Sequence, residues 1–241
     1  MRIIHAIWER RNIGSDTYEI KISPDDNFDD IIKEVIKCEG DYIVVKIPTG
    51  MVDFMNRIVD FGFRFVETSI SCHYNISQDL LLPSSKKEIL KKCSFRQMTD
   101  FDLTYLFDRL SEGLYTTDRI ALDPMFSIKI ANKRYRGWIE DELVHGSKIY
   151  NVICLGKKVG FFGLKKTEDK KYFGFLNGVY KEYQHQGFGT MVHCMEIQAA
   201  KDNGANVLQS AFSSNNNGAF SVHMSLGYRY DGAEYVFVKH Q

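Results

Sequence analysis

Two short groups of residues in the C-terminal half have types and spacings suited to chemistry. The first, Gln184-His185-Gln186-Gly187-Phe188-Gly189, joins a predicted strand, 173–180, to a predicted amphipathic helix beginning near Thr190. A helix start leaves backbone N–H groups without intrahelical partners and carries partial positive charge, so it can bind a diphosphate. Glycines at 187 and 189 let the main chain approach a ligand closely. The bend is a candidate phosphate site, with an ordinary loop as the alternative.

The second group consists of Asn216 and His223, which lie seven residues apart. Asn216 lies at the start of a second predicted helix, 218–226, and His223 lies within it. Seven residues make nearly two turns, so the two side chains share one face, about 10 Å apart along the axis. The ordinary pKa of histidine, about 6.5, allows it to donate or accept a proton near neutrality. The alternative is a packed histidine bonded to a backbone carbonyl.

The elements that must position these groups follow in a regular order. Apolar residues at helical spacing continue the first helix to Asn203-Gly204, and a strand, 207–212, separates it from the second. Upstream, the pattern predicts a strand, a helix capped at Thr99, and a hairpin around Gly156-Lys157-Lys158. The predicted strand is 94–97, the helix is 99–110, and the two strands of the hairpin are 149–155 and 159–165.

These residues resemble the GNAT acetyltransferase family. Val179 to Gly189 is similar to its acetyl-CoA pyrophosphate loop, whose signature is Gln or Arg, two residues, Gly, one residue, then Gly or Ala. The resemblance covers residues 93–241 and implies an α+β fold, with a mixed, mostly antiparallel splayed sheet flanked by helices. The second motif of the family is matched by Asn216, Ala219, His223, Gly227 and Tyr228.

The resemblance also implies roles for individual residues, with acetyl-CoA as co-substrate and no metal. The backbone N–H of Asn177 would donate to the thioester carbonyl, and His223 would face the sulfur as the acid. Many relatives have tyrosine at the latter position and other branches have histidine. His185 is expected to face solvent near the 3′-phosphate. The implied cofactor-binding residues are Val179, Gln184, His185, Gln186, Gly187, Phe188, Gly189, Thr190 and Asn216.

The general base is not identified by the sequence. Some relatives use a glutamate on the strand before the phosphate loop, but here that register holds Phe173, and 174–179 contains no carboxylate. A water chain is the remaining route for the proton. Carboxylates upstream are expected to be caps or solvated charges, and nearby aromatic side chains are expected to be core. These are Asp118, Asp123, Glu140 and Asp141, and Tyr115, Phe126, Tyr135 and Trp138.

The N-terminal residues predict a smaller α/β half-domain, 1–85, before the 90–241 catalytic domain. Its helix at 28–38 is expected to be capped by Asp25 or Asp26, and the polar run 82–87 predicts the boundary. Gly62-Phe63-Arg64-Phe65 parallels Gly227-Tyr228-Arg229-Tyr230, which fits a degenerate GNAT-like unit or a generic αβ junction. The other predicted elements are strands at 18–22, 42–47 and 65–71 and a helix at 51–60.

A weaker resemblance concerns the acceptor. Trp8-Glu9 and the run 134–140 resemble the dTDP-fucosamine acetyltransferase type, which implies a nucleotide-linked amino sugar. The sequence therefore predicts an N-acetyltransferase acting on a primary amine of a small acceptor. The alternatives are an acyl-CoA-binding regulatory protein without catalysis, and a peptide or protein N-terminal acetyltransferase.

Composition narrows the class of protein further. The 241 residues contain 31 basic and 31 acidic side chains, and a neutral chain lacks the usual positive face of a nucleic-acid-binding protein. No apolar run approaches a membrane span, and the short segment 1–8 does not resemble a signal peptide. We expect a cytoplasmic monomer or homodimer. Five scattered cysteines, at 38, 72, 93, 154 and 194, predict reduced thiols without a disulfide or zinc site.

Overall fold

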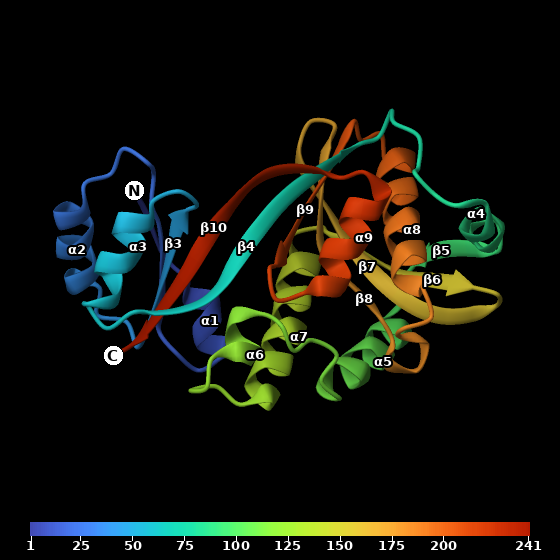
Figure 1. Ribbon diagram of the computed structural model, residues 1–241. Helices are drawn as coiled ribbons and strands as arrows, with labels where there is room; N and C mark the ends of the chain where they lie inside the picture. Colours follow the sequence, from blue (N-terminus) through green and yellow to red (C-terminus); the bar gives the residue numbers. More distant parts are fainter.

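A computed structural model describes residues 1–241 as one continuous ten-stranded sheet with helices on both faces (Figure 1). Only the β2–β3 and β8–β9 pairs are parallel, so the expected mixed, mostly antiparallel sheet is confirmed. The strands are β1 (Arg2–His5), β2 (Thr17–Lys21), β3 (Tyr42–Pro48), β4 (Arg64–Asn75), β5 (Cys93–Gln97), β6 (Lys148–Cys154), β7 (Lys157–Glu168), β8 (Lys171–Val179), β9 (Val207–Ser213) and β10 (Arg229–His240).

The strand order is β1-β2-β3-β10-β4-β9-β8-β7-β6-β5. The last strand, β10, therefore lies between two N-terminal strands, and it pairs with β3 from Glu234 to His240. In Figure 1, β10 and β4 run side by side from the N-terminal helices to the opposite half of the molecule. The backbone of the N-terminal half is thus hydrogen-bonded to the C-terminal strand. The division into a half-domain at 1–85 and a catalytic domain at 90–241 stays a prediction.

The helices cover both faces of the sheet. They are α1 (Ile7–Asn12), α2 (Phe28–Lys37), α3 (Val52–Val59), α4 (Ser84–Leu90), α5 (Asp100–Ser111), α6 (Arg119–Leu122), α7 (Ile128–Val144), α8 (Phe188–Asp202) and α9 (Asn217–Leu226), with a 3₁₀ turn, η1, at Lys181–Tyr183. None of them combines the length and apolar character that crossing a membrane requires.

Alternation along the strands separates the cores on the two faces. On β7, Phe162 packs with α8 while its neighbour Phe161 packs with α5 and α7. On β3, Val45 packs with α2 and α3 while Val44 packs on the side of α6 and α7. Because successive strand side chains point to opposite faces, each strand contributes to two cores. α8 is thereby held against the sheet half that contains β8.

Three local expectations differ from the structure. α2 is capped by Asn27, whose side chain accepts from the N–H groups of residues 29 and 30. Asp26 is instead engaged by the N-terminal ammonium and the Ser23 N–H, so the predicted cap at Asp25 or Asp26 is wrong. The run 84–87, predicted as turn, lies in α4. α7 was not anticipated, because its seventeen residues mix buried and charged side chains without a clear apolar stripe.

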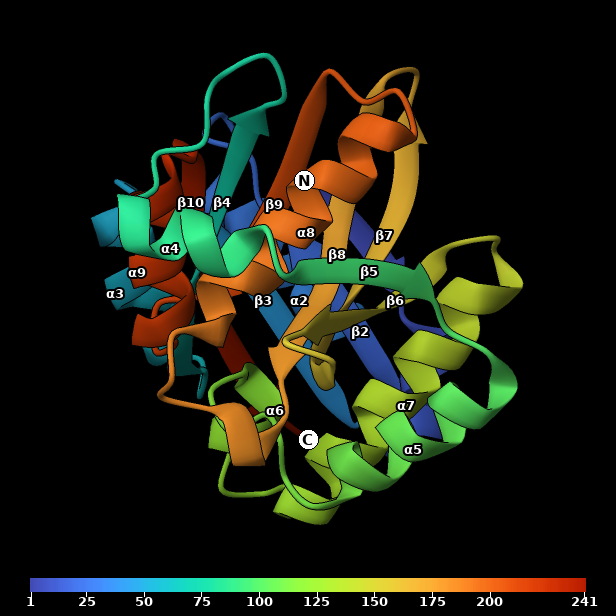
Figure 2. The ribbon, with the colours of Figure 1, turned by 90° about the vertical axis from the view of Figure 1, so that its right-hand side faces the viewer.

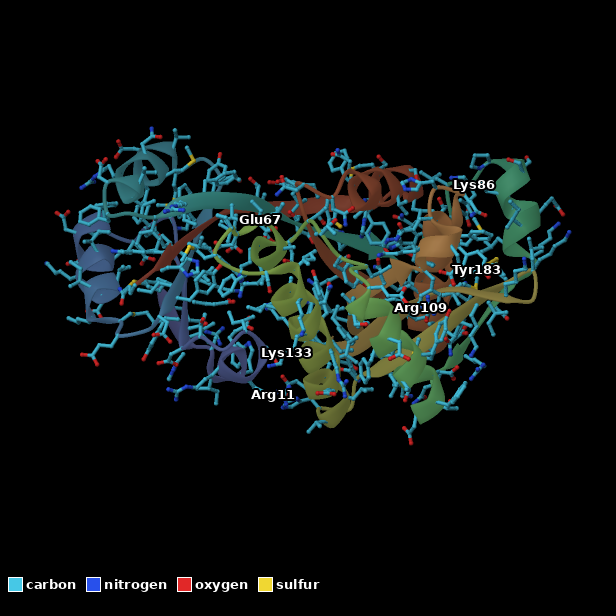
Figure 3. All side chains as sticks on the ribbon, turned by 90° about the horizontal axis from the view of Figure 1, so that it is seen from below. Arg11, Glu67, Lys86, Arg109, Lys133 and Tyr183 are labelled. Atoms are coloured by element: carbon cyan, nitrogen blue, oxygen red, sulfur yellow. A yellow bond between two sulfur atoms is a disulfide. The ribbon has the colours of Figure 1, made fainter.

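A buried ion cluster joins the N-terminal residues to α6 and α7. Glu9 on α1 is fully buried and pairs with Arg119, at 3.1 Å, and with Arg134, at 2.8 Å. Arg119 also pairs with Glu19 of β2 at 2.9 Å. Figure 3 shows Glu67 midway along the molecule, between its two halves. The positions behind the fucosamine-type resemblance, Glu9 and Arg134, therefore have a structural role here.

The cysteine expectation is wrong for one pair. Cys93 on β5 and Cys154 on β6 face each other in the antiparallel register and form a disulfide. The three other cysteines are free and buried. The pair could not be recognised from the sequence, since the two positions are 61 apart in the chain and only the strand register brings them together. Figure 2 views the molecule from this edge, with α4 leading into β5 beside α8.

Candidate functional site

The predicted phosphate bend lies between β8 and α8 and is open. Gly187 has a φ of 84° and is the N-cap of α8, whose first residue, Phe188, lies two residues earlier than the predicted start. His185 also has a positive φ, 60°. A Cβ at position 187 would meet no atom within 4 Å. No side chain caps α8, so no side chain competes with an anion for its first N–H groups.

Beside the bend, β8 and β9 separate. They pair only from Lys171 to Gly174 of β8, and residues 176–179 pair with β7 alone. The Asn177 carbonyl accepts a 2.6 Å hydrogen bond from the Tyr115 hydroxyl, and the Val179 carbonyl accepts a 3.1 Å bond from the Gln184 side chain. The N–H of a strand residue points to the same side as its C=O. The N–H groups of Asn177 and Val179 therefore point into the gap between the strands.

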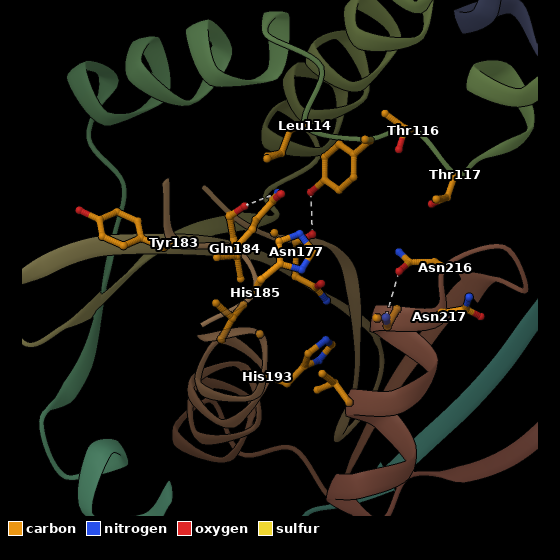
Figure 4. A pocket seen from close by; sticks show the side chains of 18 of the residues that line it. Leu114, Thr116, Thr117, Asn177, Tyr183, Gln184, His185, His193, Asn216 and Asn217 are labelled. Atoms are coloured by element: carbon orange, nitrogen blue, oxygen red, sulfur yellow. Dashed lines mark hydrogen bonds between the residues drawn. The ribbon is translucent and has the colours of Figure 1, made fainter. Parts of the chain in front are cut away.

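A cavity of about 470 Å³ occupies this gap (Figure 4). Its walls come from β8, the bend, α8, the start of α9 and the segment 114–117. Tyr115 contributes to the wall while its ring packs on Tyr135, with centroids 4.3 Å apart, so it belongs to the core as well as the site. Of the predicted site residues, the cavity brings together Asn177, Val179, Gln184, His185, Gly189 and Asn216.

The remaining residues of the bend lie elsewhere. Gln186, Gly187 and Phe188 line a smaller cavity, of about 120 Å³, together with Lys86 of α4. Thr190 is buried, and its hydroxyl accepts a 3.0 Å hydrogen bond from the Lys86 ammonium. A cation thus lies next to the first turn of α8 (Figure 3). The bend therefore has a cavity on each side, only one of which reaches β8.

His223 does not line the cavity. It is 1% exposed, its Nδ1 lies 2.7 Å from the Ala219 carbonyl oxygen, and its Nε2 lies 2.9 Å from the Ser210 hydroxyl. Burial, followed by the neighbouring His193, lowers the pKa of His223 to about 3. The imidazole is therefore neutral, with both ring nitrogens engaged, and it is stacked on Phe212 with centroids 4.6 Å apart.

Asn216 is the N-cap of α9. Its side-chain oxygen accepts a 3.0 Å hydrogen bond from the Ala219 N–H, shown as a dashed line in Figure 4. Asp118 is likewise a cap, as predicted, because its Oδ1 accepts from the N–H groups of Ile120 and Ala121. The Asn216 cap fixes the start of α9 at the cavity rim.

Two polar residues of α8 were missed by sequence reasoning. His193 lines the cavity, and Glu196 lies one turn further along the helix, fully buried. Burial lowers the pKa of His193 to about 4 and raises that of Glu196 to about 8. The only signal was a histidine and a glutamate at i and i+3 within a helix otherwise apolar on most sides. The burial of these two side chains cannot be inferred from their spacing without knowing that both faces of the helix are covered.

No protein-family model and no curated protein matches this sequence. Solved structures do match along most of its length. A functionally unknown conserved protein from Staphylococcus epidermidis is 12% identical, with a TM-score of 0.64 over 97% of this chain and 88% of that one. A GCN5-related N-acetyltransferase from Sphaerobacter thermophilus is 10% identical, with a TM-score of 0.63 over 99% and 75%.

A third match is a tandem GNAT protein from the clavulanic acid biosynthesis pathway. It is 12% identical, with a TM-score of 0.58 over 94% of this chain and 76% of that one. At identities of 10 to 12%, such similarity establishes the fold. The chain has the α+β fold seen in GNAT proteins, with a mixed, mostly antiparallel open sheet and flanking helices.

Proposed function

We propose that this protein is an acetyl-CoA-dependent N-acetyltransferase that acetylates a primary amine of a small acceptor. One observation carries the proposal: the glycine bend at the start of α8, through Gln184, His185 and Gly189, borders the same cavity as the inward-pointing N–H groups of Asn177 and Val179. The bend suits a diphosphate, and the strand gap suits an extended arm ending in a thioester.

Each group then has a defined task. The N–H groups at Gly187 and in the first turn of α8 bind the diphosphate, and the Lys86 ammonium adds positive charge nearby. The Val179 main chain pairs with the pantetheine arm, which requires the Gln184 side chain to leave the Val179 carbonyl. The Asn177 N–H donates to the thioester oxygen, where negative charge develops during attack.

His223 needs a different role from the one the family resemblance implied. Its ring nitrogens face Ala219 and Ser210, so it has no free N–H or lone pair directed at a sulfur in the cavity. Its ring centroid lies 4.4 Å from that of His193, which does line the cavity. We assign His223 to holding His193 in place.

The acceptor is predicted only as a small molecule that carries a primary amine. A nucleotide-linked amino sugar is one candidate, although Glu9 and Arg134, which suggested it, are engaged with each other at 2.8 Å. The likeness to a tandem GNAT protein over both halves of this chain supports the proposal that residues 1–85 derive from a second, degenerate unit. That half lacks any counterpart of the glycine bend between 184 and 189.

Two measurements on the pure protein test the proposal. Calorimetry should detect saturable binding of acetyl-CoA, and a thiol assay should detect free CoA only when a primary amine is supplied. Nucleotide amino sugars, polyamines and peptides with free N-termini form the three arms of the acceptor panel. A protein that neither binds acetyl-CoA nor releases thiol would contradict the proposal.

Because His223 lies outside the cavity, one alternative function is an acyl-CoA-binding regulatory protein. A site without a proton donor at the sulfur could bind the co-substrate and transfer nothing. Saturable binding with a thermal shift, and no thiol release with any arm of the panel, would favour this alternative.

A further inference from the structure

We propose that His193 accepts the proton of the attacking amine and that Glu196 positions and stabilises the resulting imidazolium. This inference rests on the proposed acetyl transfer and names the base that the strand sequence lacks. His193 touches the cavity and is therefore the catalytic residue, whereas Glu196 acts through it as a positioning residue. Both come from the middle of α8, the helix that starts at the phosphate bend.

The first support is the geometry of the pair. His193 Nδ1 lies 3.2 Å from Glu196 Oε2, although the two atoms are not aligned as a hydrogen bond. Because Nδ1 is turned toward Glu196, Nε2 is the ring nitrogen left for a ligand in the cavity. Figure 4 shows the His193 ring between α8 and α9, on the side of Asn177. A nucleophile beside Asn177 would thus face the imidazole.

The second support is that both groups are buried without satisfied hydrogen bonds. His193 Nδ1 and Glu196 Oε1 have no hydrogen-bond partner, and the side chains are 3% and 0% exposed as residues. Buried polar atoms are nearly always hydrogen-bonded, so two unsatisfied atoms in one pair call for an explanation such as catalysis. Each costs free energy that a purely structural pair would avoid.

The third support is that the sheet leaves room for the carboxylate. A Cβ on residue 174 would come within 3.0 Å of Glu196, so only glycine at this position of β8 allows the side chain to reach the strand. The Asn177 side-chain amide lies 3.5 Å from Glu196 Oε2. Gly174 is also the last residue of β8 that pairs with β9. The carboxylate therefore lies where the strands separate.

The surroundings of the pair contain titratable groups but no lysine or arginine that acts on it. His223 on α9 and Tyr228 before β10 face it, with ring centroids 4.4 and 6.3 Å from that of His193. Burial, followed by smaller contributions that include the charge of Glu196, raises the pKa values of Cys72 on β4 and of Tyr115, so these groups also lie near the pair. With no lysine or arginine beside the pair, a neutral glutamic acid lies beside a neutral imidazole.

The proposed step balances as follows. An ammonium acceptor gives one proton to His193 Nε2, and the resulting neutral nitrogen attacks the thioester carbon. The C–N bond forms, the C–S bond breaks, and the thiolate leaves. The nitrogen gives its second proton to the sulfur, and His193 passes the first to solvent. Binding of the ammonium acceptor releases the Glu196 proton to solvent, so that the carboxylate compensates the imidazolium by ion pairing at the short separation already present, and Glu196 takes a proton back from solvent once His193 is neutral again.

The test compares Glu196→Gln and His193→Gln with wild type, using whichever amine of the panel is the best acceptor. Both variants should keep acetyl-CoA affinity within about twofold and lose about 100-fold or more in turnover, as expected for removal of a general base. Hydroxylamine is already neutral at pH 7, so the loss with this nucleophile should be much smaller. A structural defect would lower both reactions equally.

The matched control is Glu168→Gln, which makes the same substitution at an exposed glutamate at the end of β7 and should leave turnover unchanged. A carbon-13 NMR titration of the glutamate carboxyls gives a readout independent of activity. The resonance lost in Glu196→Gln should titrate far above the others in wild type.

The outcomes separate the two proposals. Wild-type protein that binds no acetyl-CoA contradicts the proposed function itself. Wild-type protein that binds and transfers, while both variants keep its rate and pH profile, overturns only the assignment of the base. A Glu196 carboxyl that titrates in the ordinary range also overturns it. Variants that lose turnover with strongly basic amines while hydroxylamine still reacts support it.

Discussion

Glu196 of α8 lies against Gly174 of β8 so closely that residue 174 cannot carry a side chain without displacing the carboxylate. This relationship joins a helix that starts at the phosphate bend to the strand that lines the cavity. It also explains a glycine within a strand, where the residue otherwise weakens pairing.

Gly174→Ala should therefore destabilise the protein and disturb the site together. We expect a loss of about 1–3 kcal/mol in the free energy of unfolding, because the added methyl group overpacks a buried position. Urea denaturation measures the loss. Gly232→Ala is the matched control, since a Cβ on that β10 residue would meet nothing within 4 Å. Equal effects of the two substitutions would contradict the packing described here.

The buried α8 groups predict that stability falls on both sides of an optimum pH. The pKa values of His193 and His223, lowered by burial to about 4 and 3 from 6.5, mean that the unfolded chain binds protons first. Stability therefore falls as the pH drops below about 6.5. Burial raises the pKa of Glu196 from 4.5 to about 8, so the folded chain keeps a proton that the unfolded chain loses, and stability falls as the pH rises between these values.

Glu196→Gln isolates the alkaline side of this dependence. Its glutamine does not titrate, so the decrease in unfolding free energy from pH 6.5 to pH 8, where the histidines are largely neutral in both states, should be smaller than in wild type, by on the order of 1–3 kcal/mol. Urea denaturation at the two pH values provides the comparison. If wild type and variant lose stability equally over this interval, Glu196 is not a buried, protonated acid.

The bend can be tested with a pair of glycines at the two ends of α8. Gly187 and Gly204 have φ values of 84° and 81°, and a Cβ at either would meet nothing within 4 Å. Gly187→Asp places a negative charge at the proposed diphosphate site and should weaken CoA binding at least ~10-fold, about 1.4 kcal/mol. Gly204→Asp imposes similar backbone strain and should leave the affinity unchanged. Calorimetric affinities that respond equally to both would exclude phosphate binding at the bend.

The Cys93–Cys154 disulfide predicts a redox-dependent stability. Reduction should lower the free energy of unfolding by about 2–4 kcal/mol, because the bond closes a long loop in the unfolded chain. The reducing agent should have no further effect on the double variant Cys93→Ser/Cys154→Ser. Thiol titration of the unfolded, unreduced wild type should count only Cys38, Cys72 and Cys194. Five reactive thiols would show that the pair does not form.

Much of the site could be predicted because its signals are local. Glycines at 187 and 189 next to an apolar helical pattern located the start of α8 to within two residues, and Gly227 marked the end of α9. The same reasoning anticipated that a histidine at 223 could bond to a backbone carbonyl, which here is that of Ala219. Local dihedral preference and helical periodicity were sufficient for these features.

Other features depend on contacts between residues far apart in the sequence. β10 lies between β3 and β4, and no pattern within 229–240 specifies those neighbours. The Cys93–Cys154 pairing depends on strand register, and the burial of Glu196 depends on Gly174, 22 positions earlier in the printed sequence. Periodicity identifies an element and its apolar face, but not which partner covers the opposite face.

The most direct test of the central claim is a crystal structure of the protein with bound coenzyme A. The account predicts the diphosphate within hydrogen-bond distance of the backbone N–H groups between Gln184 and Gly189. It also predicts the pantetheine arm along Val179 and the sulfur in the cavity beside Asn177 and His193. A coenzyme bound elsewhere, or a bend that stays empty at saturating coenzyme, would contradict it.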